Sequence, residues 1–328
     1  MAQADLVLEG GGAKLPALIG ALSALTAEPH GYTFQRIAGA SAGAIVGALA
    51  AAGTSTEELK TIMLTKDFRD FEDLGPVFRL APWLGKAVGL LFHQGMYRGR
   101  ELHRFLTELL AARGVHTWAD LRQDDPGSCL PLERRYKLVV IVSDVSRGRM
   151  LRLPWDYEPL LGVDPDAQPV ADAVCASAAI PFFFRPVQLP ADPKVVGRRS
   201  VLCVDGGILS SFPVSIFDRT DLRPARWPTF GVKLSGRATA KTAWRPNRTT
   251  VEFAVSLLST MINAHDQIHI DDPKVAARTI FVDTSGHSAT DFNLSRADKL
   301  RLFDAGERAG QRFLESWDWE EWKERHGS

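Results

Sequence analysis

The sequence is poor in cysteine, which limits the kinds of site that it can build. Only Cys129, Cys175 and Cys203 occur in 328 residues, and no two of them form a CxxC pair. A sparse, odd set of this kind indicates neither a disulfide framework nor a zinc site. We therefore expect a reducing compartment.

Charge and hydropathy exclude two further classes of protein. Lys and Arg total 39 and Asp and Glu total 39, so the formal net charge is zero. A nucleic-acid-binding domain usually carries a basic excess, so we expect no nucleic-acid partner. No apolar run reaches the roughly 18 residues of a membrane span, and the N-terminus lacks the features of a signal peptide. These absences predict a cytoplasmic protein whose contact with membranes, if any, is peripheral and uses a local patch.

Strand-like and helix-like segments alternate along the chain, which is typical of an α/β protein with a largely parallel sheet between helices. Thr56 is expected to cap one helix, and the sequence has no internal repeat. We expect a single domain over residues 1–328 with its core at about 5–315. Apolar runs predict strands at 5–9, 33–38, 136–145, 200–204, 228–236 and 279–284, and helical spacing predicts helices at 14–27, 42–52, 171–179, 251–266 and 295–317.

A glycine-rich loop lies between the first expected strand and helix. Gly10, Gly11 and Gly12 are followed by Ala13 and Lys14. Successive glycines allow several N–H groups to point to one place near a helix N-terminus, where a negative oxygen is stabilised. The occupant is a phosphate or the oxyanion of an acyl-transfer reaction. The Walker A and dinucleotide fingerprints are both absent.

A GxSxG sequence connects the second expected strand to its helix. Gly39 lies two residues before Ser41, and Gly43 lies two residues after it. A sharp strand-to-helix turn of this type exposes the central serine, and small neighbours relieve crowding. The sequence favours Ser41 as a nucleophile over the alternative that it only caps the helix.

Asp205, followed by Gly206 and Gly207, ends a later expected strand. A carboxylate at the carboxyl end of a strand lies where open α/β sheets build their sites. A Ser–His–Asp hydrolase also needs a histidine after the acid. His287, in a polar loop, is the best candidate for that role, whereas a Ser–Asp pair needs a carboxylate of raised basicity in direct contact with the serine.

The three motifs, in this order, resemble the patatin-like phospholipases, whose pattern is GGGx[KR], then GxSxG, then DG[GA]. The segments 176–187, 205–217 and 284–295 are also similar to that family, so the likeness covers residues 5–315. The resemblance implies a three-layer α/β/α fold and a Ser–Asp dyad without histidine, metal or cofactor. Two departures are Leu15, where glycine is usual, and Ser210 with Ser211, where asparagine is common.

The resemblance also implies roles for individual residues. Ser41 becomes the nucleophile and Asp205 the base, with Gly10, Gly11, Gly12 and Lys14 at the oxyanion hole. The implied substrate is an acyl lipid, whose ester is cleaved through an acyl-enzyme. Two other functions stay open, namely a Ser–His–Asp esterase using His287 and a catalytically silent lipid-binding module.

Two segments outside these motifs have their own expectations. Residues 75–97 are apolar but broken by glycine and proline, as in a lid that contacts lipid or an ordinary core helix. The tail 316–328 carries three closely spaced tryptophans, which either pack on the body or touch an interface.

Overall fold

The computed structural model describes residues 2–74, 89–90, 93–221, 223–234, 260 and 272–326. The expected lid at 75–97 lies mostly outside these residues, as does the helix expected at 251–266. Within the described part, no helix is long and apolar enough to cross a membrane.

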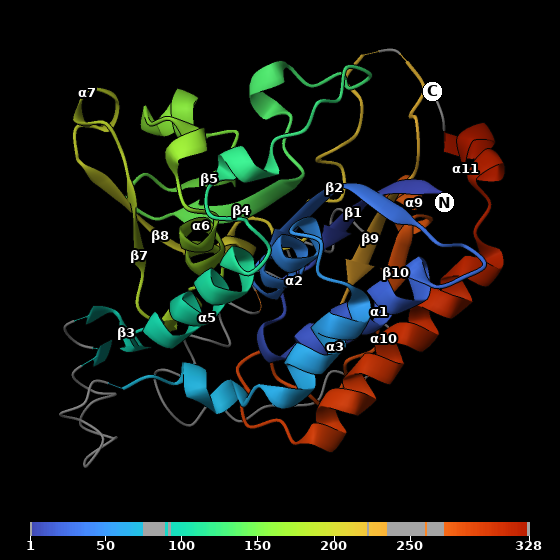
Figure 1. Cartoon of the computed structure of the whole chain (residues 1–328), viewed down its shortest axis with the longest axis horizontal. Coiled ribbons are helices and arrows are strands. Elements are labelled where there is room, and N and C mark those ends of the chain that lie inside the picture. The colour runs from blue at the N-terminus through green and yellow to red at the C-terminus, as the bar shows by residue number, and fades with distance from the viewer. Residues whose placement is uncertain are drawn as a thin grey trace.

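A mixed sheet forms the centre of the molecule, with its strands in the order β10-β9-β1-β2-β4-β8-β7 and β5 paired to β4 (Figure 1). The first five of these strands run parallel, whereas β5 and β8 are antiparallel to β4 and β7 is antiparallel to β8. The strands are β1 (Gln3–Leu8), β2 (Thr33–Ala40), β4 (Leu138–Asp144), β5 (Arg149–Leu153), β7 (Val187–Pro190), β8 (Ser200–Asp205), β9 (Thr229–Lys233) and β10 (Thr279–Phe281). A separate two-stranded sheet pairs β3 (Gly95–Tyr97) with β6 (Phe182–Phe184).

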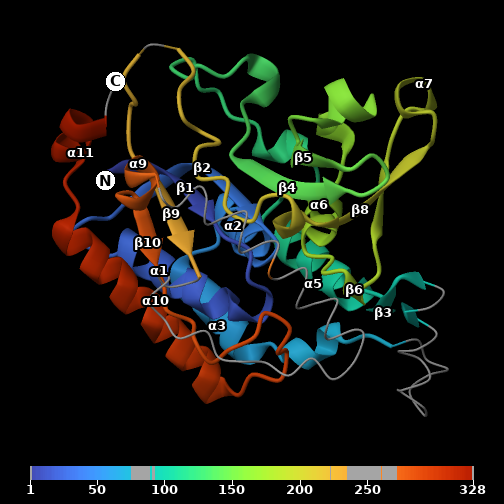
Figure 2. The ribbon, with the colours of Figure 1, turned by 180° about the vertical axis from the view of Figure 1, so that it is seen from behind.

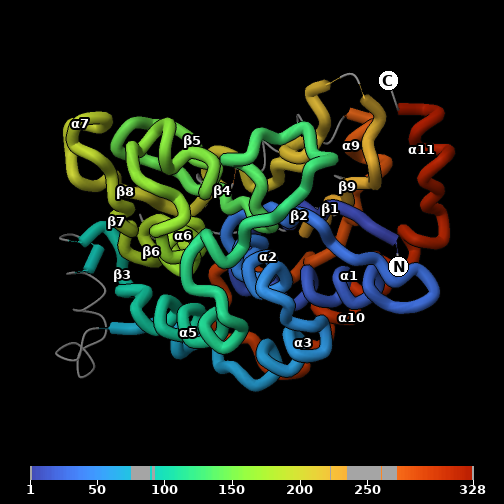
Figure 3. Tube along the Cα trace, turned by 45° about the horizontal axis from the view of Figure 1, so that its top comes forward, coloured from blue at the N-terminus to red at the C-terminus, as the bar shows by residue number. Residues whose placement is uncertain are grey.

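Helices cover the sheet and complete the expected three-layer α/β/α fold with a largely parallel sheet. They include α1 (Leu15–Thr26), α2 (Ala42–Ala51), α3 (Thr56–Thr65), α5 (Arg100–Ala111), α6 (Val170–Ser177), α7 (Pro193–Val196), α9 (Pro273–Ala276), α10 (Arg296–Ser316) and α11 (Trp319–His326). Seen from behind, β9 and β10 lie in front of α1 and α10 (Figure 2). The Cα trace shows α5 and α6 beside the small β3–β6 sheet (Figure 3).

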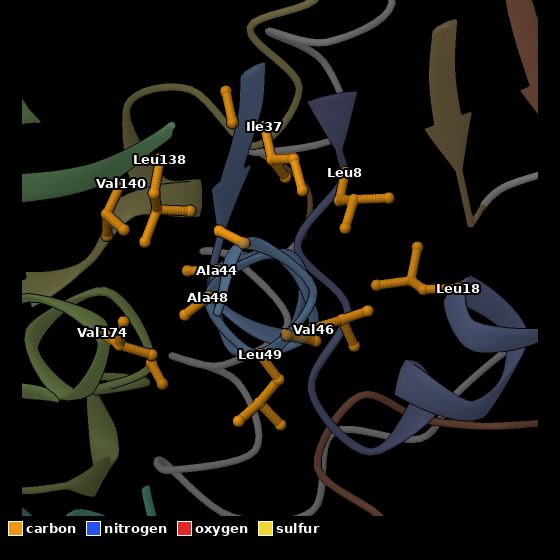
Figure 4. Packing of buried hydrophobic residues seen from close by; sticks show 14 of the residues in the cluster. Leu8, Leu18, Ile37, Ala44, Val46, Ala48, Leu49, Leu138, Val140 and Val174 are labelled. Carbon is orange, nitrogen blue, oxygen red and sulfur yellow. The ribbon is translucent and has the colours of Figure 1, made fainter. Parts of the chain in front are cut away.

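The core is built around α2, which is apolar on all sides. Leu8, Ile37 and Val140 from three strands approach it on one side, while Leu18 of α1 and Val174 of α6 flank it (Figure 4). A helix buried on every face is held firmly by its packing. Its first residue, Ala42, directly follows Ser41, so the core fixes the position of the candidate nucleophile.

Some local expectations differ from the structure. Ser55, not Thr56, caps α3, because a capping box joins Ser55 to Glu58. The short strands β3, β5, β6 and β7 were not expected, since each is only three to five residues long. In the tail, the buried side chain of Trp322 stacks on Trp319 with ring centroids 5.3 Å apart.

Candidate active site

Two strands that end against the same edge of β4 bring the candidate residues together. β2 ends at Ala40 opposite Ile141, and β8 ends at Asp205 opposite Val142. β5 pairs with Val140 to Asp144 of β4, a stretch that includes residues paired with β2 and residues paired with β8. Since one edge of a strand can hold only one partner at each residue, β5 occupies the opposite edge of β4 from both β2 and β8. β2 and β8 therefore run toward each other along one edge of β4. Ser41, the residue after Ala40, meets Asp205 where the two strands stop.

This register changes the explanation for Asp205. Asp205 ends its strand, as expected, but β8 is antiparallel to β4 and does not belong to the parallel part of the sheet. β8 enters from the carboxyl end of β4 and stops partway along it. Asp205 reaches the site because β8 is short enough to end beside Ser41.

Ser41 occupies a strained turn between β2 and α2. Its φ and ψ are 51° and −121°, in a region that residues with a side chain rarely adopt. Its side chain makes no capping hydrogen bond to α2. Instead, it forms a hydrogen bond with the Asp205 side chain. The alternative that Ser41 is only a helix cap therefore does not fit this geometry.

Gly39 and Gly43 allow the turn to be this tight. A Cβ on Gly39 would lie 2.4 Å from the Gly43 carbonyl carbon, and a Cβ on Gly43 would lie 2.3 Å from the Leu8 carbonyl oxygen. Neither distance is possible for a real side chain, so the motif needs glycine at both positions. This close approach sets the start of α2, and the positive end of its dipole, beside Ser41.

Asp205 is a buried carboxylate with few partners. Burial raises its pKa from 3.8 to about 6, although hydrogen bonds from the Ser41 side chain and the Gly207 amide oppose the rise. The Gly207 amide donates to Oδ1 at 2.8 Å. Gly206 is also required, because a Cβ there would lie 2.1 Å from the Ile141 carbonyl oxygen. A carboxylate with a pKa near the working pH is suited to accept a proton.

We expect Asp205→Asn to stabilise the protein above pH 6. In the unfolded chain Asp205 titrates near 3.8, whereas in the folded protein it holds its proton up to a pKa of about 6. The buried charge therefore destabilises the folded state above pH 6, and this cost disappears as the pH falls through 6 toward 3.8. The gap in pKa corresponds to a gain of at most about 3 kcal/mol for the neutral, isosteric variant.

Urea unfolding of both proteins between pH 5 and 8 measures this difference. Asp283→Asn is the control, because hydrogen bonds from Ser285 lower the pKa of Asp283, so neutralising it brings no gain. An Asp205→Asn advantage that stays constant across this pH range would contradict the raised pKa.

Ser177, at the end of α6, is a part of the site that the motifs did not indicate. Its hydroxyl accepts a hydrogen bond from the Ser41 amide at 2.9 Å and donates one to the Ile141 carbonyl at 2.6 Å. The side chain is fully buried. Ser177 therefore ties the strained turn to β4, and it uses the amide of Ser41, which is then not free to bind an oxyanion. In the sequence, Ser177 lies in an Ala-rich helix and in the family-like segment 176–187, but neither feature predicts this contact.

Ser177→Ala should lower kcat for ester hydrolysis by about 10- to 100-fold with little change in KM, because the turn that aims Ser41 loses its support. The change also leaves a buried donor and a buried acceptor unpaired, which costs stability. Thr279→Val is a matched control, since it removes a buried hydroxyl that donates to the Val275 carbonyl at 2.7 Å. Equal loss of kcat in the two variants would mean that Ser177 acts only through general stability.

In the glycine loop, two backbone amides have no hydrogen-bond acceptor among the described residues. The Gly10 amide donates to the Ser211 carbonyl at 3.2 Å, and the Lys14 amide donates to the Gly11 carbonyl at 3.1 Å. Within the described residues, the amides of Gly11 and Gly12 donate to no other group. Of the amides in this loop, those of Gly11 and Gly12 are thus available to an oxyanion, whereas those of Gly10 and Lys14 hold the loop.

Contacts on both sides fix this loop beside Ser41. A Cβ on Gly10 would lie 3.1 Å from the Ser41 Cβ. Gly12 has a φ of 53°, and a Cβ there would lie 2.0 Å from the Ala289 carbonyl oxygen. Just before the loop, Glu9 forms a buried ion pair with Lys233. The loop is therefore preorganised, as an oxyanion site requires.

His287 lies in the loop that follows β10. Its amide donates to the Thr284 carbonyl at 3.3 Å. In the part of the chain that the structure describes, no hydrogen bond joins its ring to Ser41 or Asp205. The direct contact between Ser41 and Asp205 leaves no position for a bridging imidazole.

Comparison with known proteins gives consistent results. A family model described as patatin-like phospholipase matches residues 6–218. The chain is 34% identical over 316 residues to the uncharacterized protein YqhO of Bacillus subtilis (strain 168), covering 95% of this chain and 98% of YqhO.

Two solved structures are also similar. VipD from Legionella pneumophila has a TM-score of 0.53 at 17% identity, over 95% of this chain and 67% of VipD. ExoU from Pseudomonas aeruginosa, solved in complex with SpcU, has a TM-score of 0.47 at 18% identity, and the match covers 95% of this chain and 52% of ExoU.

Proposed function

Because this chain belongs to the patatin-like phospholipase family, we propose that it hydrolyses carboxylic esters of phospholipids or related acyl lipids through Ser41 and Asp205. Family membership supports a lipid hydrolase in general, and the dyad and the acyl-enzyme are the proposal. The observation that carries it is the buried Asp205 carboxylate, with a pKa of about 6, hydrogen-bonded to a serine on a strained turn.

In the first half of the reaction, Ser41 Oγ attacks the ester carbonyl while its proton moves to the Asp205 carboxylate. The carbonyl oxygen becomes an oxyanion, which the amides of Gly11 and Gly12 stabilise. The tetrahedral intermediate then collapses. The bond to the alcohol breaks, Asp205 returns the proton to the leaving oxygen, and the acyl group stays on Ser41.

In the second half, water replaces the alcohol. Asp205 takes a proton from the water as its oxygen attacks the acyl carbonyl, and the same two amides stabilise the second oxyanion. Collapse releases the fatty acid, and the proton passes from Asp205 to Ser41 Oγ. The enzyme returns to its starting state, so the net reaction consumes one water and one ester.

An acyl lipid is mostly found in a membrane, so the proposal includes peripheral contact of a cytoplasmic protein with a lipid surface. Among the described residues, no helix is long and apolar enough to cross a membrane. The proposed contact with a lipid surface rests on the proposed substrate class.

Ser41→Ala and Asp205→Asn should each lower lipid hydrolysis by at least about a thousandfold, because the two residues act as a unit. The measurement is mass spectrometry of fatty acids released from a mixed panel of phospholipids, lysophospholipids and acylglycerols. The released products also define the head group and the ester position that the enzyme prefers. Wild-type kcat/KM should rise as the pH increases through about 6, since Asp205 acts as a base only when ionised.

The two alternative functions, a Ser–His–Asp esterase and a silent lipid-binding module, predict different experimental outcomes. His287→Ala should retain turnover, and a loss as large as that of Ser41→Ala would favour the Ser–His–Asp esterase. A fluorophosphonate probe should label wild-type Ser41. Absence of labelling together with retained lipid binding would favour the silent lipid-binding module.

A further inference from the structure

The small β3–β6 sheet places two arginines side by side. β3 and β6 run parallel, with Gly95 opposite Phe182 and Tyr97 opposite Phe184. The next residues along the two strands are Arg98 and Arg185, and the Arg185 amide donates to the Tyr97 carbonyl at 2.9 Å. The backbone ladder therefore holds two cationic residues together at the ends of these strands.

Among the described residues, no carboxylate pairs with either guanidinium. The Nε atoms of Arg98 and Arg185 are buried without a hydrogen-bond partner. Burial and the positive charges of Arg98 and Arg100 lower the pKa of Arg185, with Asp73 opposing. A like-charged pair of this kind is costly unless an anion joins it.

A cavity of about 670 Å³ includes Arg98 of this pair, together with Arg100, in its lining. Its four carboxylates already have partners. Asp70 pairs with Lys66 at 2.7 Å, Glu101 pairs with Arg104 at 2.5 Å, and Glu72 accepts the Tyr97 hydroxyl at 2.8 Å.

The fourth carboxylate, Asp73, caps α5. It accepts the amides of Gly99 at 2.7 Å, Arg100 at 2.8 Å and Glu101 at 3.4 Å. The hydrogen-bonding positions of these carboxylates are thus used by donors other than the guanidiniums of Arg98 and Arg185. The lining carries four cationic and four acidic side chains, and Arg185, outside the lining, adds a further positive charge beside Arg98.

The same segments connect the arginines to the candidate active site. β6 begins five residues after Ser177, which binds the Ser41 amide. Phe183 of β6 stacks on Phe292 with ring centroids 4.8 Å apart. Phe292 lies three residues after Ala289, whose carbonyl accepts the Ala13 amide of the glycine loop at 2.8 Å. The strand that ends before Arg185 is therefore connected along the chain to Ser177, and through the packing of Phe183 on Phe292 to the segment that binds the glycine loop.

We propose that Arg98 and Arg185, with Arg100 beside them, bind the phosphate group of a phospholipid substrate. The proposal rests on the proposed lipid hydrolase function and names the substrate class. Paired guanidiniums match the oxygens of phosphate in geometry and charge better than a single ammonium does. Free phosphate has the same chemistry as the head group, so the experiment must separate the two sources.

The test compares Arg98→Gln/Arg185→Gln with wild type on phosphatidylglycerol and on diacylglycerol with the same acyl chains. We take the ratio of kcat/KM on phosphatidylglycerol to kcat/KM on diacylglycerol. In the double variant this ratio should be lower than in wild type by about tenfold or more, because charge-assisted hydrogen bonds to phosphate are lost. Arg104→Gln is the matched control, since Arg104 lines the same cavity but pairs with Glu101 and Glu108. It should leave the ratio unchanged. An unchanged ratio in the double variant, or the same fall in Arg104→Gln, would overturn the proposal.

Binding measurements separate this proposal from the proposed function. Wild type should sediment with vesicles containing phosphatidylglycerol more than the double variant does, whether or not it cleaves lipid. If wild type binds these vesicles through the arginines but cleaves no ester, the proposed function fails and the phosphate site stands. If inorganic phosphate raises Tm in wild type only, while vesicle binding and the ratio do not change, the site takes free phosphate and the head-group proposal fails. The double variant should fold, because removing both like charges relieves their repulsion, and its circular dichroism spectrum and Tm verify this.

Discussion

The direct contact between the Asp205 carboxylate and the Ser41 hydroxyl depends on where two strands stop. Each strand ends against β4, one opposite Ile141 and the other opposite Val142. If either strand were longer by a residue, the two ends would collide, and if either were shorter, the side chains would separate. The register of β4 with its neighbours is therefore the constraint that the site requires, and the packing of α2 and α6 serves to keep it.

This arrangement is energetically unfavourable in isolation. It buries a carboxylate whose pKa is raised to about 6, and it holds a serine at a φ of 51°. Both features lower stability, and they persist only because the surrounding structure determines them. The all-apolar α2 and the buried Ser177 hydroxyl supply that support from two sides. Strain and burial at one place, supported by a well-packed core, are typical of sites that carry chemistry.

Local sequence was sufficient for the motifs but not for the long-range pairing. Three glycines, a GxSxG turn and an Asp-Gly turn are short patterns with a direct geometric meaning, so the family and the α/β/α fold could be predicted from them. The direction of β8 could not, because strand polarity is decided by the partner strand and not by the residues in the strand. Ser177 was missed for a similar reason. Its partners lie 136 and 36 residues away in the chain, at Ser41 and Ile141.

In the glycine loop, too, the sequence predicts the kind of site and only the structure shows which groups form it. Its composition predicted an anion site, but only the structure shows that Gly10 and Lys14 use their amides to hold the loop, which leaves those of Gly11 and Gly12. The pairing of the arginines had no sequence signal, since Arg98 and Arg185 are 87 positions apart and only Arg185 lies in a family-like segment, 176–187.

Strand register therefore accounts for both proposed parts of the site. Along β4 it brings an acid to a serine, and at the ends of β3 and β6 it brings one arginine to another. In each pair, the side chains alone would not favour the contact, because one buries a carboxylate and the other joins like charges. Backbone hydrogen bonds between the strands fix these positions before substrate binds. The free energy of folding therefore offsets the cost of burying the carboxylate and of holding the like charges together. A substrate with an ester and a phosphate would then find each of its polar groups opposite a partner that folding had already put in place.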